Sequence, residues 1–290
     1  MPMRNKDFAV FILSYGRAER VTTYEILKRV GYTGKIYFLC STDDKDLPRY
    51  REIYGDQVIA FDKEDYKGTF DVGDNFGDNR GVVYARNANF GIAEKMGLKY
   101  YLQLDDDYMI FAYKFNQNME YGEKIIKNFD SICDIFVDFL ATSPVCSIAF
   151  GQGGDFIGGG QNSYVKDFVH SRRKLMNSFF NRVDRPYQFL GRINEDTTSY
   201  VYNGSLGKIF FTILMISLTQ KTTQSNVGGL TEQYLDIGTY VKSFYSIMFC
   251  PSCVKISVMG EKFKRLHHSI SWVNAVPVII DENYKRPVNQ

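Results

Sequence analysis

Short, almost wholly apolar segments alternate with amphipathic segments over residues 8–104, and this alternation limits the possible folds more than any other feature. The apolar segments are rich in β-branched and aromatic side chains, and they predict strands at residues 8–13, 35–40, 58–61 and 99–104. Between them, the spacing of apolar residues predicts helices at 19–30 and 82–96. Strands that are apolar on both faces must be covered on both faces, so the pattern predicts an α/β fold with a parallel sheet.

The rest of the chain continues this pattern less regularly. Residues 125–140 predict a further helix and 146–150 a further strand, followed by the glycine-rich stretch 151–160, which predicts a loop. Residues 168–201 are basic, aromatic and less periodic. No internal repeat and no Pro/Ser-rich linker divides the 290 residues, so we expect one continuous domain, 1–290.

Composition excludes several classes of protein. Hydrophobic residues make up 44% of the chain and charged residues 23%, with a net charge of only +2, which is typical of a globular domain and not of a disordered or polybasic protein. The longest apolar run, 209–218, is half of the ~20 residues that a membrane span needs. Five cysteines, an odd number, argue against a disulfide framework. We therefore expect a soluble, cytoplasmic protein without a membrane segment.

Three consecutive carboxylates, Asp105, Asp106 and Asp107, follow the predicted strand 99–104 directly. Side chains alternate along a strand, so Asp105 and Asp107 should share one face and Asp106 the other. Carboxylates held this close repel each other unless a cation lies between them, and oxygen ligands suit Mg²⁺ or Mn²⁺. The alternative is a solvated acidic turn with no ligand.

The aspartates, together with Ala85-Arg86-Asn87 and Gly91-Ile92-Ala93 upstream, resemble the nucleotide-sugar half of GT-A glycosyltransferases. The resemblance implies a GT-A, Rossmann-like sheet in which residues 1–110 bind a nucleotide-sugar, with UDP as the expected nucleotide, and residues 111–290 bind the acceptor. It implies that Asp105 and Asp107 hold the Mn²⁺ or Mg²⁺ on the diphosphate. The donor contacts expected from it are Ser14, Tyr15, Arg17, Thr42, Asp43, Asp44, Arg86, Asp105 and Asp106.

Two further motifs fit this resemblance. Glu195 and Asp196 match the acidic acceptor-side motif of inverting GT-A enzymes, in which one carboxylate is the general base for the acceptor hydroxyl. The same residues would also suit a helix N-terminus with Asn194 as its cap. A histidine commonly completes the metal site of GT-A enzymes, so His267 or His268 is expected as a third ligand, the alternative being a surface turn.

A narrower resemblance covers nearly the whole chain. The motifs Gly191–Asp196, Gln220, Gly228–Tyr234, Val241-Lys242-Ser243 and His267-His268 look like those of phage DNA-base glycosyltransferases and their relatives, which are encoded beside base-oxidising dioxygenases. The acceptor it implies is a hydroxymethylated pyrimidine, such as 5-hydroxymethylcytosine, in double-stranded or locally opened DNA.

A DNA acceptor calls for cations and aromatic rings. The segment 166–192 holds seven Lys/Arg and two Asp, a net charge of +5. The expected phosphate contacts are Arg172, Arg173, Lys174, Arg182, Arg185 and Arg192, and the expected stacking rings are Phe179, Phe180, Tyr187 and Phe189. The alternative is a solvated basic face above core aromatics.

Other functions stay open from the sequence. They are a GT-A enzyme with a saccharide or lipid-linked acceptor, a nucleotidyltransferase, and a non-catalytic DNA-binding module on the same fold. Cys250 and Cys253 with the histidine pair have the spacing of a Cys₂His₂ zinc site, but Cys250 ends an apolar run that predicts a strand, and the helix of a zinc finger is missing.

Overall fold

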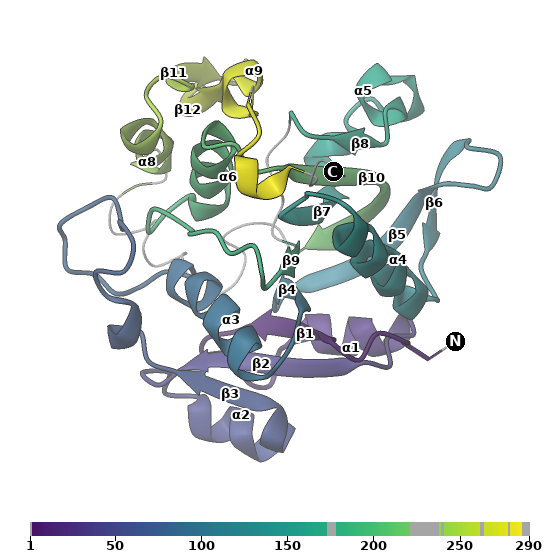
Figure 1. Cartoon of the computed structure of the whole chain (residues 1–290), viewed down its shortest axis with the longest axis vertical. Helices are drawn as coiled ribbons and strands as arrows, with labels where there is room; N and C mark the ends of the chain where they lie inside the picture. Colours follow the sequence, from purple (N-terminus) through teal and green to yellow (C-terminus); the bar gives the residue numbers. More distant parts are fainter. Residues whose placement is uncertain are drawn as a thin grey trace, which may run out of the picture.

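A computed structural model describes residues 2–172, 178–220, 238, 241–261, 264–277 and 279–285. Its main element is a mixed sheet with the strand order β3-β2-β1-β4-β9-β7-β10-β5-β6, and β8 pairs with β10 beside this path. Figure 1 shows the sheet running through the molecule with helices on both sides. The strands of this sheet are β1 (Phe8–Leu13), β2 (Lys35–Ser41), β3 (Val58–Phe61), β4 (Tyr100–Asp105), β5 (Tyr108–Phe115), β6 (Tyr121–Ile125), β7 (Ser147–Gln152), β8 (Val169–His170), β9 (Phe179–Arg182) and β10 (Phe210–Gln220).

The predicted parallel sheet is confirmed for the first four strands. β1 pairs in parallel with β2 and β4, and β2 pairs in parallel with β3. From β9 onward the pairing is mostly antiparallel, with β7 and β10 as the parallel exception. The carboxyl ends of β1, β2, β3 and β4 therefore meet at one edge of the sheet, which is where α/β folds bind ligands.

Helices α1 (Thr22–Arg29) and α4 (Phe129–Thr142) cover one face of the sheet, and α3 (Val83–Lys95) and α6 (Glu195–Ser205) cover the other. The alternation of side chains along β1 makes this possible, because Phe8, Val10 and Ile12 enter one core while Ala9, Phe11 and Leu13 enter the other. The other α-helices in the described ranges are α2 (Leu47–Tyr54), α5 (Ser163–Lys166), α8 (Lys242–Phe249) and α9 (Trp272–Ala275).

A separate hairpin of β11 (Val254–Met259) and β12 (Arg265–Ile270) forms a second sheet beside α8. Several predicted elements need correction in this part of the chain and before it. The predicted helix 125–140 begins at Phe129, because the preceding residues form β6. The apolar run before Cys250 is α8 and not a strand. The glycine-rich stretch 151–160 is the end of β7 followed by two 3₁₀ turns, Gly153–Phe156 and Gly159–Gln161.

No helix in the described part of the chain has both the length and the apolar character needed to cross a membrane.

Candidate active site

The aspartate triplet lies at the carboxyl end of β4, where Asp105 is the last strand residue and Asp105 and Asp106 point in opposite directions, as predicted for these two. Asp106 points towards the loop after β1, where its carboxylate accepts hydrogen bonds from Ser14 Oγ at 2.5 Å and Arg17 Nη1 at 2.8 Å. Asp105 points the other way, to Arg86. Thr23 of α1 fixes the backbone between them, since its Oγ1 donates to the Asp105 carbonyl at 2.6 Å and its N–H to the Asp106 carbonyl at 3.1 Å.

Arg86 lies between the triplet and α6. Its side chain is 2% exposed; Nη2 donates to Asp105 Oδ1 at 3.1 Å and Nε to Glu195 Oε1 at 3.0 Å. The guanidinium lies over the rings of Phe179 and Phe189, at 5.2 and 5.8 Å from their centroids. This one buried cation therefore joins the predicted donor-side carboxylate to the predicted acceptor-side carboxylate.

Burial raises the pKa of Asp105 to about 7, because a charged carboxylate loses its hydration there; the Arg86 charge opposes this shift, and Asp107 and Glu195 add to it. Burial also raises the pKa of Glu195, again against Arg86 and with Asp196 adding to the shift. Positive charge that approaches this group would favour the charged form of its carboxylates. The donor set at Asp105 and Asp107, two hard carboxylates at a ligand-binding edge, therefore fits Mg²⁺ or Mn²⁺.

Glu195 and Asp196 form the first turn of α6, but they differ in environment. Glu195 is 4% exposed and is committed to Arg86. Asp196 is half-buried, and its Oδ1 accepts the N–H of Thr197 at 2.7 Å. Asn194 occupies the N-cap position in the left-handed conformation, with φ 61°, and its side chain makes no capping hydrogen bond; it donates instead to Ser246 Oγ at 2.6 Å. The capping alternative is thus only partly correct, and the backbone strain lies next to the two acids.

The predicted donor residues at the ends of β1 and β2 are brought together but fall into two groups. Ser14 and Asp44 are buried, and Asp44 Oδ2 accepts the Gly16 N–H at 2.8 Å, so with Asp106 and Arg17 they shape the loop after β1. Tyr15, Thr42 and Asp43 are the exposed members of the set.

Lys63, after β3, contacts two members of this exposed group and was missed from the sequence; its own side chain is 12% exposed. Its Nζ bonds Asp43 Oδ2 at 2.9 Å and lies 4.7 Å from the centroid of the Tyr15 ring. The sequence could have indicated it, because Lys63 follows the predicted strand 58–61 by two residues and that strand ends at the same edge of the sheet as β1 and β2.

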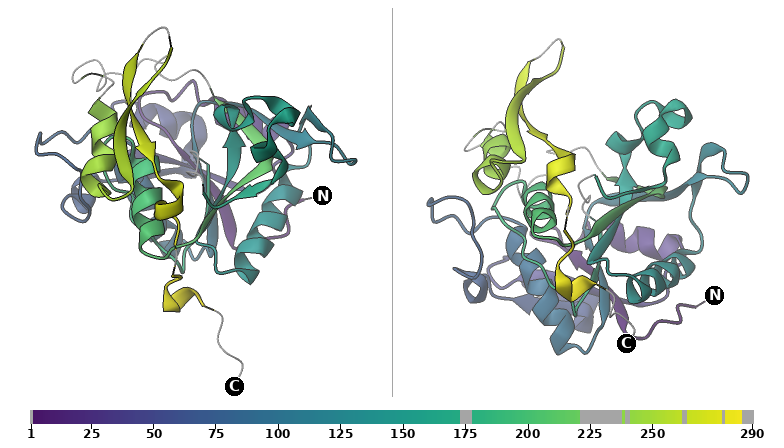
Figure 2. Two further views of the ribbon diagram at one scale, coloured as in Figure 1. Left: turned by 90° about the horizontal axis from the view of Figure 1, so that it is seen from above. Right: turned by 45° about the horizontal axis from the view of Figure 1, so that its top comes forward.

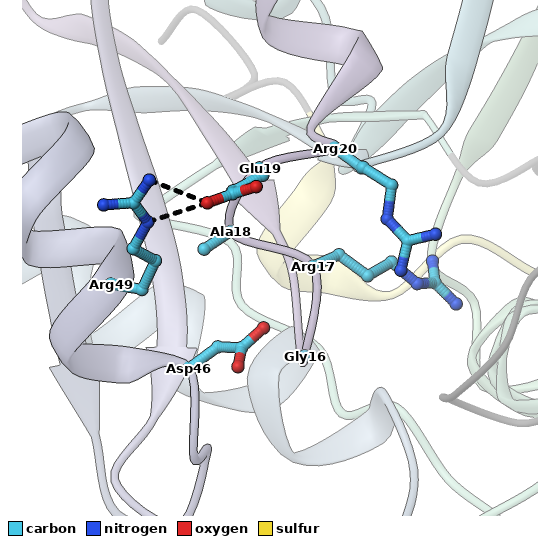
Figure 3. Close-up of a pocket in the computed structure, with 7 residues that line it drawn as sticks. All are labelled: Gly16, Arg17, Ala18, Glu19, Arg20, Asp46 and Arg49. Atoms are coloured by element: carbon cyan, nitrogen blue, oxygen red, sulfur yellow. Dashed lines mark hydrogen bonds and ion pairs between the residues drawn. The ribbon is translucent and has the colours of Figure 1, made fainter.

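Figure 3 shows a pocket of about 240 Å³ on another side of the loop after β1, lined by residues 16–20, Asp46 and Arg49. Arg49 pairs there with Glu19 at 2.7 Å and also with Glu52 at 2.6 Å. Of the three arginines that line the pocket, Arg49 is paired in this way and Arg17 is paired with Asp106, and the pocket contains none of the aspartate triplet.

The predicted third metal ligand is not supported. His267 and His268 lie on β12, opposite Ser257 and Ile256 in the hairpin, so they point to opposite faces of it. Within the described ranges, no three His, Cys, Asp or Glu side chains are grouped so that they could hold a metal ion. Neither the histidines with Asp105 and Asp107 nor the Cys₂His₂ zinc alternative is therefore assembled.

The basic segment 166–192 also differs from its prediction. The Arg192 side chain is fully buried and pairs with Asp74 and Asp78, each at 2.8 Å. The Arg182 side chain, 10% exposed, pairs with Asp184 at 2.7 Å and donates to the Leu140 and Ser143 carbonyls. These two arginines are structural, because burial leaves them no access to a phosphate.

The other predicted phosphate contacts of that segment differ in exposure. Arg185 is half-buried and donates to the Ser143 carbonyl at 3.3 Å, and Arg172 is exposed. Arg173 and Lys174 lie outside the described residues. The predicted stacking rings are core residues, each at most 5% exposed: Phe179, Phe180, Tyr187 and Phe189.

The family model of the TET-associated glycosyltransferases matches residues 8–229. The matched segment includes the aspartate triplet, Arg86 and the acids of α6. The chain belongs to this family of glycosyltransferases, which confirms the predicted enzyme class.

Solved structures similar to the chain include glucosyl-3-phosphoglycerate synthase from Mycobacterium tuberculosis in complex with Mg²⁺ and UDP (10% identity, TM-score 0.47, covering 91% of this chain and 87% of that one). The structure of TarS residues 1–349 from S. aureus is also similar (13% identity, TM-score 0.43), with the match covering 83% of this chain and 65% of that one. Mannosyl-3-phosphoglycerate synthase from Rubrobacter xylanophilus (9% identity, TM-score 0.42) covers 91% and 86%. No curated protein matches the chain.

Proposed function

We propose that the protein transfers a sugar from a nucleotide-sugar, with UDP as the nucleotide, to the hydroxymethyl group of a modified pyrimidine in DNA. The observation that carries the proposal is the Arg86 bridge, because it brings Asp105 and Glu195 into one buried group. A donor-side carboxylate and an acceptor-side carboxylate must lie this close for one enzyme to act on both substrates. The TET association of the family supports a modified base as acceptor.

We assign the donor to residues 1–110 and the acceptor to residues 111–290. Asp105 and Asp107 would hold Mn²⁺ or Mg²⁺, which when bound neutralises the charge of the diphosphate leaving group. Tyr15, Thr42 and Asp43 are the exposed side chains for the nucleotide. Ser14, Arg17, Asp44 and Asp106 keep that loop in shape, so for them we propose a supporting role.

Asp196 is the general base in this proposal, because Glu195 is occupied by Arg86 and Asp196 is the more accessible acid. The acceptor hydroxyl loses its proton to the Asp196 carboxylate as its oxygen bonds to the anomeric carbon of the sugar. The bond between that carbon and the diphosphate oxygen breaks, and the nucleoside diphosphate leaves with the electron pair. Arg86 opposes the rise in the pKa of Glu195 that burial causes, and it sets the position of the first turn of α6. A cytoplasmic location would give the enzyme access to both substrates.

The test is a panel of nucleotide-sugars incubated with the protein and Mn²⁺, with release of nucleoside diphosphate as readout. Each donor is offered with duplex DNA containing 5-hydroxymethylcytosine, with duplex DNA containing 5-hydroxymethyluracil, and with unmodified duplex DNA of the same sequence. We expect release to rise with a hydroxymethylated duplex and not with the unmodified one. Release that rises only with a saccharide or lipid-linked acceptor would overturn the DNA assignment and leave the glycosyltransferase.

A further inference from the structure

The β11–β12 hairpin has no part in the chemistry proposed above. It also lies outside residues 8–229, the segment that the family model matches. Figure 2 shows it as the yellow-green ribbon that projects from the body of the molecule. Its strands pair antiparallel from Val254 opposite Ile270, at the base, to Met259 opposite Arg265.

The register divides the hairpin into two faces of different chemistry. One face carries Val254, Ile256 and Val258 with their partners Ile270, His268 and Leu266. Its base is buried, with Val254 1% exposed, and its outer part is not, with Val258 62% exposed. The other face is polar and basic except for Met259, and carries Lys255, Ser257 and Met259 with their partners Ser269, His267 and Arg265.

Positive charge is concentrated on this ribbon. Residues 254–270 contain four Lys/Arg and one Glu, a net charge of +3 where the whole chain has +2. Lys255, Lys264 and Arg265 are exposed. These side chains differ from Arg182 and Arg192 of segment 166–192, which are buried and form internal ion pairs.

Helix α8 links the hairpin to α6, the helix that presents the acids. Ser243 Oγ of α8 donates to the Leu266 carbonyl at 3.4 Å, and Ser246 Oγ of α8 accepts from Asn194 Nδ2 at 2.6 Å. Ser246 also bonds Thr198 Oγ1 of α6 at 3.0 Å. A molecule held by the hairpin is therefore held in a fixed relation to Asn194 and to Asp196 two residues later.

We propose that the basic face of the β11–β12 hairpin binds the phosphate backbone of the duplex that carries the acceptor base. This inference rests on the proposed DNA acceptor and adds to it a surface. A two-stranded ribbon is one of the elements that the DNA major groove admits, and exposed lysine and arginine supply the phosphate contacts that set register along the duplex. Because α8 contacts both the hairpin and Asn194, a duplex bound to the hairpin would have its acceptor base placed at a set position relative to Asp196.

The experiment compares a double variant, Lys255→Ala with Arg265→Ala, against a control pair, Lys6→Ala with Lys95→Ala. Lys6, before β1, and Lys95, at the end of α3 and before β4, are exposed. They lie near the amino ends of these strands, at the edge of the sheet opposite the aspartate triplet, and both double variants remove two positive charges. Affinity for a hydroxymethylated duplex is measured as a function of salt concentration, and thermal melting confirms that each variant is folded.

Each lost phosphate contact reduces the slope of log affinity against log salt by ~0.9, so we expect the hairpin variant to lose about 2 units of slope and the control none. The hairpin variant should also need more duplex for half-maximal transfer, with turnover retained at saturating duplex. If the wild type glycosylates the duplex but the hairpin variant keeps the wild-type slope, the hairpin proposal alone is wrong. If the wild type does not act on DNA, both proposals fail. Loss of binding to anionic vesicles, with DNA binding unchanged, would make the ribbon a membrane contact and overturn the proposal.

Discussion

The two sides of the catalytic edge hold their carboxylates by different means. On the donor side, the pairing of β1 with β4 positions the carboxylates. Leu13 pairs with Asp105, and the next residues of the two segments, Ser14 and Asp106, are joined by a side-chain hydrogen bond. On the acceptor side no strand leads to the acids of α6. Their position depends on Arg86, which reaches Glu195, and on Arg192, which fastens the segment before them to Asp74 and Asp78.

This difference teaches where the enzyme is sensitive to substitution. Contacts that follow from strand register are shared with many backbone hydrogen bonds and survive the loss of one side chain. Contacts made by a buried arginine have no such support, and removing one partner leaves an uncompensated buried charge. The following predictions test this comparison, from the largest expected effect on turnover to the smallest.

Asp107→Ala should reduce transfer below detection, because it removes one of the two carboxylates that we assign to the metal. The fold should be little affected, since Asp107 adds to the repulsion that raises the pKa of Asp105. Turnover with Mn²⁺ and the melting temperature are the two measurements. Wild-type turnover at saturating Mn²⁺ would show that the metal assignment is wrong.

Asp196→Asn should lower turnover by ~10²–10⁴-fold with donor binding retained, because the amide cannot accept the hydroxyl proton. Glu195→Gln is the paired variant. It should disturb the Arg86 contact and therefore lower stability as well as turnover. Turnover is compared at a temperature at which both variants are folded. A larger loss in Glu195→Gln than in Asp196→Asn would reverse the two assigned roles.

Arg86→Lys should lower turnover by about 10–10²-fold, because a lysine cannot bridge Asp105 and Glu195 with the geometry of a guanidinium. Arg182→Lys is the matched control, since Arg182 is also buried and ion-paired but contacts neither acid. The donor KM should change little in either variant. An equal loss of turnover in both would mean that Arg86 serves only the stability of the fold.

Arg192→Gln should have the smallest effect on turnover and a large effect on stability, about 3–5 kcal/mol, because Asp74 loses its partner in a buried setting. Denaturant unfolding measures the stability, and turnover is measured well below the melting temperature. A turnover loss as large as that of Arg86→Lys would remove the distinction between the two arginines.

The same cluster should make the protein sensitive to acid. Burial alone would raise the pKa of Asp78, but hydrogen bonds from Arg80 and Arg192 outweigh it and hold that pKa well below its usual range. The contribution to stability is therefore complete above pH ~4, the unfolded value, and is lost as pH falls through the lower folded value. Arg192→Gln should unfold with a weaker dependence on pH below 4 than the wild type, as followed by circular dichroism.

The sequence predicted the donor side well because its signals are local. The strands from β1 to β4 are continuous apolar runs, and the parity of Asp105 and Asp106 follows from the strand that precedes them. Strands β5, β6 and β9 gave no comparable signal. β5 and β9 pair antiparallel with β10 and β4, which lie far along the chain, and β6 is an exposed strand that pairs with β5. Tertiary pairing decides their structure, and propensity does not.

The acceptor side was predicted in residue type but not in placement. An arginine in a basic segment has the same sequence signature whether it is exposed or neutralised by an aspartate elsewhere, as Arg192 is by Asp74. Likewise, the spacing of His267 and His268 indicates ligands, but their strand lies in a hairpin that does not group them with Asp105. Only the folded arrangement distinguishes these cases.

The most direct test of the central claim is the mass of a short duplex that contains one 5-hydroxymethylcytosine, taken before and after incubation with the protein, Mn²⁺ and each nucleotide-sugar. We predict a mass increase of one sugar residue on the hydroxymethylated strand, with no increase for an unmodified duplex and an increase at least ~10²-fold slower for Asp196→Asn under the same conditions. An unchanged duplex mass with every donor, or the same gain on unmodified cytosine, would contradict transfer to the hydroxymethyl group.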